Sequence, residues 1–145
     1  MSAMNEPLAK DAARVKRTGS CFCGAVKYAA DGAPLNVRVC HCRDCQRLTG
    51  SAFFARALYP KKAVAITGAP AEFASSDDLV RKFCPRCGSQ IFAERRSNPD
   101  AIAIALGSFD DLAGLAPSEH IWVSDKQPWL AIPAEARQHA ESAPK

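Results

Sequence analysis

The sequence predicts a mainly β fold with short helical turns, built as one domain. Short segments rich in β-branched and aromatic side chains recur along the chain, and turn residues separate them. No segment keeps a helical period over three turns. The 145 residues, 48% of them hydrophobic and 23% charged, are enough for a single core of ordinary size.

The first expected elements lead into a cysteine cluster. Residues 25–30 (AVKYAA) form a plausible strand, which ends at the turn dipeptide Asp31-Gly32. Residues 35–40 (LNVRVC) alternate between apolar and polar positions, which is typical of a strand. Residues 44–50 allow one helical turn, because Gly50 can end it in the left-handed conformation.

The middle of the chain reads as further short strands between breaks. They are expected at 51–59, 63–68, 71–76, 79–84 and 90–95. The first is rich in aromatic residues, and Pro60 ends it. Gly68-Ala69-Pro70 separates the next two, because glycine and proline favour a turn.

The last elements precede an expected tail. Residues 101–109 (AIAIALGSF) are the most strongly apolar strand candidate, 110–116 read as a short helical turn or loop, and 119–125 as the last strand. We therefore expect a domain over 18–130, with a flexible N-terminal tail over 1–17 and a C-terminal tail over 131–145.

The seven cysteines predict metal binding. They fall in three tight groups, and an odd number of thiols without a secretory signal argues against a disulfide framework. Cys84-Pro85-Arg86-Cys87-Gly88 has the spacing of a zinc knuckle, and Cys21-Phe22-Cys23-Gly24 is a tighter version. Together these two pairs supply the four thiolates of a tetrahedral structural zinc: Cys21, Cys23, Cys84 and Cys87.

The remaining group, Cys40, Cys42 and Cys45, has three thiols and so predicts a second zinc with an open position. A soft three-thiolate site suits a substrate thiolate. His41 is an alternative fourth ligand, although an extended backbone would point it to the opposite face. Asp44 is a second alternative. A single site drawn from all three groups would leave three cysteines without a role.

Four segments together resemble the glutathione-dependent formaldehyde-activating family, also called the centromere protein V/GFA domain family. They are GSCFCGAVKY, VCHCRDCQRLTGSAF, KFCPRCGSQIF and IWVSDKQPW, which extend from about Gly19 to Trp129. The resemblance implies an Mss4-like β domain organised around two zinc ions, with the same two ligand sets. It also implies a carbon–sulfur lyase similar to S-(hydroxymethyl)glutathione synthase, which combines glutathione with formaldehyde.

Carried onto this chain, the resemblance implies that the substrate thiolate binds at Cys40, Cys42 and Cys45 and attacks the aldehyde carbon. Arg43, Gln46 and Arg47 are candidates for holding a substrate carboxylate. For several other residues we favour a structural role over a functional one. Phe53, Phe54, Trp122 and Trp129 are expected mainly in the core, His41 bonded to backbone, and His120 on the surface rather than as a proton shuttle.

Charge and hydropathy narrow the classes of function. The formal charge is +4, but seven thiolates would subtract seven and two divalent ions would add four, leaving +1. With no basic block, nucleic acid is an improbable partner. No apolar run is long enough to span a membrane and no secretory signal is evident, so a cytoplasmic protein is expected. A homodimer, a non-catalytic zinc-stabilised binding module and a thiol or redox sensor stay open as alternatives.

Overall fold

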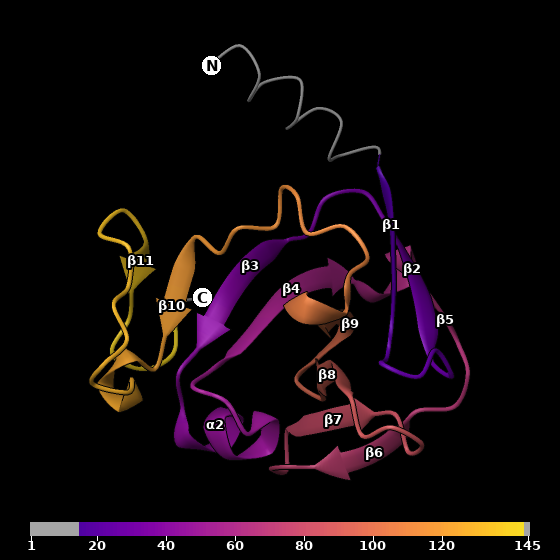
Figure 1. Cartoon of the computed structure of the whole chain (residues 1–145), viewed down its shortest axis with the longest axis horizontal. Coiled ribbons are helices and arrows are strands. Elements are labelled where there is room, and N and C mark those ends of the chain that lie inside the picture. Colours follow the sequence, from indigo (N-terminus) through magenta and orange to yellow (C-terminus); the bar gives the residue numbers. More distant parts are fainter. Residues whose placement is uncertain (1–14, 144–145) are drawn as a thin grey trace.

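A computed structural model describes residues 15–143, and it confirms the mainly β fold with short helical turns. The strands form two sheets (Figure 1). Within the described residues the only α-helix is α2 (Arg43–Thr49), and three short 3-10 helices join strands: η1 (Lys61–Ala63), η2 (Leu106–Ser108) and η3 (Val123–Asp125). No helix in this part of the chain has the length and hydropathy needed to cross a bilayer.

The smaller sheet has three antiparallel strands in the order β1–β2–β5. They are β1 (Lys16–Ser20), β2 (Lys27–Asp31) and β5 (Val64–Thr67). Gly19 allows β1 to approach its neighbours, since a Cβ there would lie 2.2 Å from the Tyr28 hydroxyl and 2.4 Å from the Ser108 carbonyl oxygen. Only glycine fits this position without displacing backbone.

The larger sheet has eight strands in the order β11–β10–β3–β4–β9–β8–β7–β6. In chain order they are β3 (Asn36–Cys40), β4 (Phe54–Pro60), β6 (Ala71–Ala74), β7 (Leu79–Phe83), β8 (Gln90–Arg95), β9 (Asn98–Ala105), β10 (Glu119–Ile121) and β11 (Arg137–Gln138). The β3–β10 and β10–β11 pairs are parallel, and the other pairs are antiparallel.

The core lies where one face of the larger sheet meets the smaller sheet. The alternation along strands puts these side chains on that face: Val37, Ala57, Tyr59, Ile102 and Ile104. From the smaller sheet, the Tyr28 ring packs edge-on against Phe92 and Phe109, with ring centroids 5.5 and 5.4 Å apart. Burying this apolar face is the main driving force for the fold.

The intervening residues of the same strands point to the opposite face. Arg38 and Cys40 on β3 alternate with Val37 and Val39, and Arg56 on β4 precedes the buried Ala57. This opposite face is therefore polar where the core face is apolar, and it carries the site described below.

Two strands lie where the sequence predicts tails. β1 begins at Lys16, inside the expected N-terminal tail, and β11 falls in the expected C-terminal tail. Residues 1–14, the rest of the N-terminal prediction, lie outside the described residues. β10 is also shorter than expected, because Trp122 takes a left-handed conformation with φ 57° and ends the strand.

Candidate metal centres and the adjoining cavity

The four thiols of Cys21, Cys23, Cys84 and Cys87 meet between the end of β1 and the end of β7. Their sulfur atoms all lie within 4.8 Å of one another. Cys23 Sγ is 3.7 Å from both Cys21 Sγ and Cys84 Sγ. Four zinc–sulfur bonds of 2.3 Å in a tetrahedron place the sulfurs about 3.8 Å apart. The four thiols therefore fit a tetrahedral metal ion.

Hydrogen bonds around this four-thiol site favour a thiolate at Cys87, whereas contacts with the other thiols raise the pKa of Cys23. The Val26 amide donates to Cys21 Sγ at 3.3 Å, and the Ser89 hydroxyl lies 3.2 Å from Cys87 Sγ. The Ser89 contacts lower the pKa of Cys87 to about 5. Gly88 has φ +81°, which lets the knuckle turn back so that its amide donates to the Cys84 carbonyl at 2.8 Å.

A second group of thiols, Cys40, Cys42 and Cys45, lies where β3 runs into α2. Their sulfur atoms are also within 4.8 Å of one another. Cys42 is the N-cap of α2, and its Sγ accepts the Cys45 amide at 3.3 Å. Contacts with the Cys40 and Cys45 thiols lower the pKa of Cys42 to about 2. The pKa values of Cys40 and Cys45 are raised, so the thiolate of this cluster is at Cys42. The thiolate is the form of cysteine that binds metals.

Neither predicted alternative ligand joins this trio. His41 Nε2 instead lies 2.8 Å from His120 Nδ1, and the group that could hold a metal consists of thiols alone. Asp44 lines the adjoining cavity but is not part of that group. All seven cysteines are free of disulfides. Two separate thiol clusters can therefore bind metal, as the spacing predicts.

A cavity of about 760 Å³ opens on the face of the larger sheet that points away from the core, and the three thiols line it. Five arginines also line it: Arg38, Arg43, Arg56, Arg81 and Arg95. Its only carboxylates among the described residues are those of Asp44 and Asp125. The excess of guanidinium groups makes the cavity attractive to anions.

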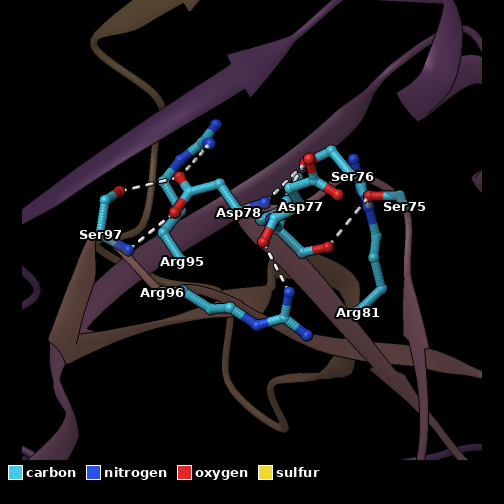
Figure 2. Close-up of polar contacts among 9 residues, drawn as sticks. Ser75, Ser76, Asp77, Asp78, Arg81, Arg95, Arg96 and Ser97 are labelled. Atoms are coloured by element: carbon cyan, nitrogen blue, oxygen red, sulfur yellow. Dashed lines mark hydrogen bonds and ion pairs between the residues drawn. The ribbon is translucent and has the colours of Figure 1, made fainter.

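Arg81 on β7 is the cavity arginine that hydrogen-bonds a thiol of the trio. Its side chain is buried, and Nη2 donates to Cys45 Sγ at 3.5 Å. Nε donates to the Ser75 hydroxyl at 3.2 Å, a contact drawn in Figure 2. The guanidinium also lies 5.8 Å from the centre of the Phe54 ring. These contacts fix a positive charge beside one of the three thiols.

Two cavity residues, Arg95 and Ser97, belong to a polar network between two hairpins (Figure 2). The Asp78 carboxylate accepts the Ser97 amide at 2.7 Å and the Ser97 hydroxyl at 2.8 Å, and Arg95 Nη1 lies 3.4 Å away. These bonds lower the pKa of Asp78. These contacts hold the β6–β7 and β8–β9 hairpins together and give Arg95 a counter-ion.

The two histidines do not behave as the sequence suggests. His41 bonds a side chain rather than backbone, and His120 is buried rather than on the surface, because parallel pairing of β10 with β3 brings the rings together. Burial lowers the pKa of His41 to about 4 and also lowers that of His120. Neither ring lines the cavity, so neither is placed to contact a ligand bound there.

The predicted carboxylate-binding residues of α2 separate in the structure. Gln46 is buried, and its Nε2 donates to the carbonyls of His41 at 2.7 Å and Asp125 at 3.0 Å, so it holds α2 against η3. Arg47 lines a second, smaller cavity of about 440 Å³, and Arg43 lines both. Only Arg43 of the three is available to a ligand beside the thiols.

The four predicted core aromatics also differ in their surroundings. Phe54 and Trp122 line the large cavity, whereas Phe53 packs edge-on against His41 with ring centroids 5.8 Å apart. Trp129 is 70% exposed and lines the smaller cavity. Phe54 and Trp122 therefore supply apolar wall to the cavity rather than core packing.

Sequence reasoning missed four of the five cavity arginines: Arg38, Arg56, Arg81 and Arg95. A signal was present for the first, because residues two apart on a strand share a face and Arg38 stands two before Cys40. The register then places Arg38 directly opposite Arg56. Nothing in the sequence alone relates Arg81 to Cys45.

Comparison with known proteins agrees with these thiol clusters. A family profile described as glutathione-dependent formaldehyde-activating enzyme matches residues 16–125. This chain belongs to the glutathione-dependent formaldehyde-activating family. The match covers both thiol clusters and every strand from β1 to β10. It leaves out β11.

A solved structure supports the fold of this family member. The crystal structure of a Rhodobacter sphaeroides protein from a structural genomics programme is similar, with a TM-score of 0.54 and 27% sequence identity. The match covers 69% of this chain and 91% of that protein.

Proposed function

We propose that this protein is a carbon–sulfur lyase that uses zinc to form or cleave the adduct between a thiol and an aldehyde. The family description supports glutathione and formaldehyde as the reactants, and hence S-(hydroxymethyl)glutathione as the adduct. The observation that carries the proposal is the position of Cys40, Cys42 and Cys45. Three thiols that could hold a metal face an open cavity, and no fourth described side chain completes their set.

The two thiol clusters have different roles in this proposal. Cys21, Cys23, Cys84 and Cys87 hold a structural zinc, because four thiolates fill its tetrahedral coordination. Cys40, Cys42 and Cys45 hold a second zinc and leave one position toward the cavity. When bound there, zinc would lower the pKa of an incoming thiol and hold it as a nucleophilic thiolate.

The protein residues then position the reactants. The reaction forms a bond between the thiol sulfur and the carbonyl carbon, and the carbonyl oxygen gains the proton that the thiol loses. Asp44 and Asp125 line the cavity, so either carboxylate, or water beside it, can relay that proton. Phe54, Ile121 and Trp122 line the same space and exclude part of the solvent. The reverse sequence releases the aldehyde.

The test must separate catalysis from the spontaneous addition of formaldehyde to thiols. Exchange spectroscopy by NMR measures the rate at which glutathione and its hydroxymethyl adduct interconvert at equilibrium. The zinc-loaded protein is expected to increase this rate in proportion to its concentration, whereas Cys42→Ser is expected to leave it at the background value. Arg47→Gln, whose side chain lines the smaller cavity, is a matched control that keeps the wild-type rate. A fully zinc-loaded wild-type protein that leaves the exchange rate unchanged would refute the lyase proposal.

A further inference from the structure

The cavity contains two arginines placed face to face. Arg38 on β3 and Arg56 on β4 are directly opposite in the register of the two strands, and both line the cavity. Like charges that face each other across two strands destabilise a sheet. The arrangement therefore has a free-energy cost that the fold alone does not explain.

The two arginines differ in how their charges are balanced. Arg38 Nε lies 3.1 Å from a Glu119 carboxylate oxygen, and Glu119 also contacts Arg137 at 3.4 Å and His139 at 2.9 Å. Arg56 Nη1 instead donates to the neutral side-chain oxygen of Asn36. Within residues 15–143, no carboxylate lies within ion-pairing distance of Arg56.

Arg56 is also partly removed from solvent. Burial, with a smaller contribution from the neighbouring Arg38, lowers the pKa of Arg56 to about 10, so the side chain keeps its charge at neutral pH. Cys40 and Glu119 attract this charge from a longer distance, but they do not offset the effect of burial. A partly buried charge with no counter-ion in contact is unfavourable, and a ligand that supplies one would relieve that cost. The guanidinium fork matches a carboxylate, which can accept two parallel hydrogen bonds.

The spacing along β3 suits a ligand that carries both a thiol and a carboxylate. Cys40 and Arg38 are two residues apart on one face, a separation of roughly 6.6 Å between their α-carbons. A carboxylate one residue beyond a cysteine lies at a similar distance from its sulfur, since an extended residue spans about 3.4 Å. The trio and both arginines line one cavity, so a ligand that carries a thiol and a carboxylate can present one group to each.

We propose that Arg56, opposite Arg38, binds a carboxylate of the substrate thiol and makes this site selective for anionic thiols. The inference rests on the proposed function in one respect, that the substrate thiol binds at Cys40, Cys42 and Cys45. It assigns the specificity to β3 and β4, not to the arginines of α2 that the sequence suggests. Arg56 acts in binding and takes no part in the chemical step.

The test compares two thiols that differ only in charge, cysteinylglycine and its C-terminal amide. Their dissociation constants are measured with the cobalt-loaded protein, in which a thiolate that binds the metal changes the visible absorption. A charge-assisted hydrogen bond contributes about 1.5–3 kcal/mol, so the wild-type protein is expected to bind the acid about 10-fold to 100-fold more tightly than the amide. Arg56→Gln is expected to bind both equally, at the wild-type affinity for the amide. Arg56→Lys keeps the charge but loses the fork, and an intermediate preference is expected.

Arg95→Gln is the matched control, because Arg95 lines the same cavity but already has Asp78 as its partner. It is expected to keep the wild-type preference for the acid. A preference that survives in Arg56→Gln, or that Arg95→Gln abolishes equally, would overturn the carboxylate site. Equal binding of acid and amide by the wild type would also overturn it but leave the lyase proposal intact. Selective binding without accelerated exchange would overturn the lyase proposal alone.

A ligand-free measurement separates a binding role from a structural one. If Arg56 serves to bind a ligand, its charge destabilises the sheet when no ligand is present. Without thiol, Arg56→Gln is then expected to raise the melting temperature of the metal-loaded protein or leave it unchanged. Wild-type protein is expected to gain more thermal stability from cysteinylglycine than Arg56→Gln does. A variant that melts well below the wild type without ligand would assign Arg56 a structural role instead.

Discussion

Arg81 Nη2 donates a hydrogen bond to Cys45 Sγ at 3.5 Å, although the two residues lie 36 positions apart in the sequence. The contact joins β7 to the thiol trio at the end of β3. Three thiolates around a divalent ion carry a net negative charge, and a buried guanidinium beside them offsets part of it. A donor to a ligand sulfur also fixes the orientation of that sulfur.

We therefore predict that Arg81→Gln weakens metal binding at the trio by about 10-fold to 100-fold, the usual effect of removing a residue that supports a metal ligand. Chelator competition on the zinc-loaded protein measures the affinities of both sites. Arg86→Gln is the control, because Arg86 is exposed within the Cys84–Cys87 knuckle and is expected to change neither affinity. Equal loss of metal from both clusters in Arg81→Gln would mean that Arg81 supports the fold and not the trio.

The two clusters are expected to contribute differently to stability. The four-thiol site joins the end of β1 to the end of β7; Cys21 and Cys84 are in the core, and Cys23 and Cys87 pack against it. The trio instead lines a cavity. Cys84→Ser is expected to lower the free energy of unfolding by several kcal/mol, because metal binding at a structural site contributes directly to folding. Cys42→Ser is expected to cost much less.

Denaturant unfolding with metal analysis of the same samples measures both effects. Each variant is expected to lose about one metal ion per chain, so the two variants can be compared at equal metal loss. If Cys42→Ser proved as destabilising as Cys84→Ser, the division into a structural and an open site would be wrong.

The buried histidine pair predicts a pH dependence of stability. The pKa of His41 is lowered to about 4 in the folded protein, so below pH 6.5 the unfolded chain binds a proton that the folded chain does not. Stability is then complete above about pH 6.5 and is lost as the pH falls toward 4. His41→Gln is expected to reduce this slope by up to about 1.4 kcal/mol per pH unit.

Urea unfolding of both proteins between pH 7.5 and 4.5, with a fixed excess of zinc, measures the difference. Protonation of the thiolates contributes to both curves and is removed by comparing them. Parallel curves would show that the folded His41 accepts its proton as readily as the unfolded residue.

A strand can be predicted from the sequence where a local pattern of apolar residues marks it. It cannot be predicted where it depends on pairing with a distant segment. Alternation along 35–40 predicts β3, because one buried face imposes a period of two. The apolar run 101–109 predicts β9, in which the successive residues 101–104 are all buried. β1 has no such pattern, since its sequence KRTGS is polar and its pairing depends on Gly19 lying against Tyr28. β11 is two residues long and pairs in parallel, so no local signal marks it.

The residues of the candidate site also differ in whether the sequence predicts them. Thiol spacing within a cluster is local and predicts which cysteines act together, because zinc fixes the distances between its ligands. The His41–His120 contact joins residues 79 apart in the sequence, and only the parallel pairing of β10 with β3 brings them together. Four of the five cavity arginines come from β3, β4, β7 and β8, so their proximity depends on the order of strands in the sheet.

A crystal structure of the zinc-loaded protein with glutathione tests the central claim most directly. We predict two zinc ions in each chain, one bound by Cys21, Cys23, Cys84 and Cys87, the other by Cys40, Cys42, Cys45 and the sulfur of glutathione. A fourth protein side chain on the second ion, or a disulfide within the trio in an active preparation, would contradict the account.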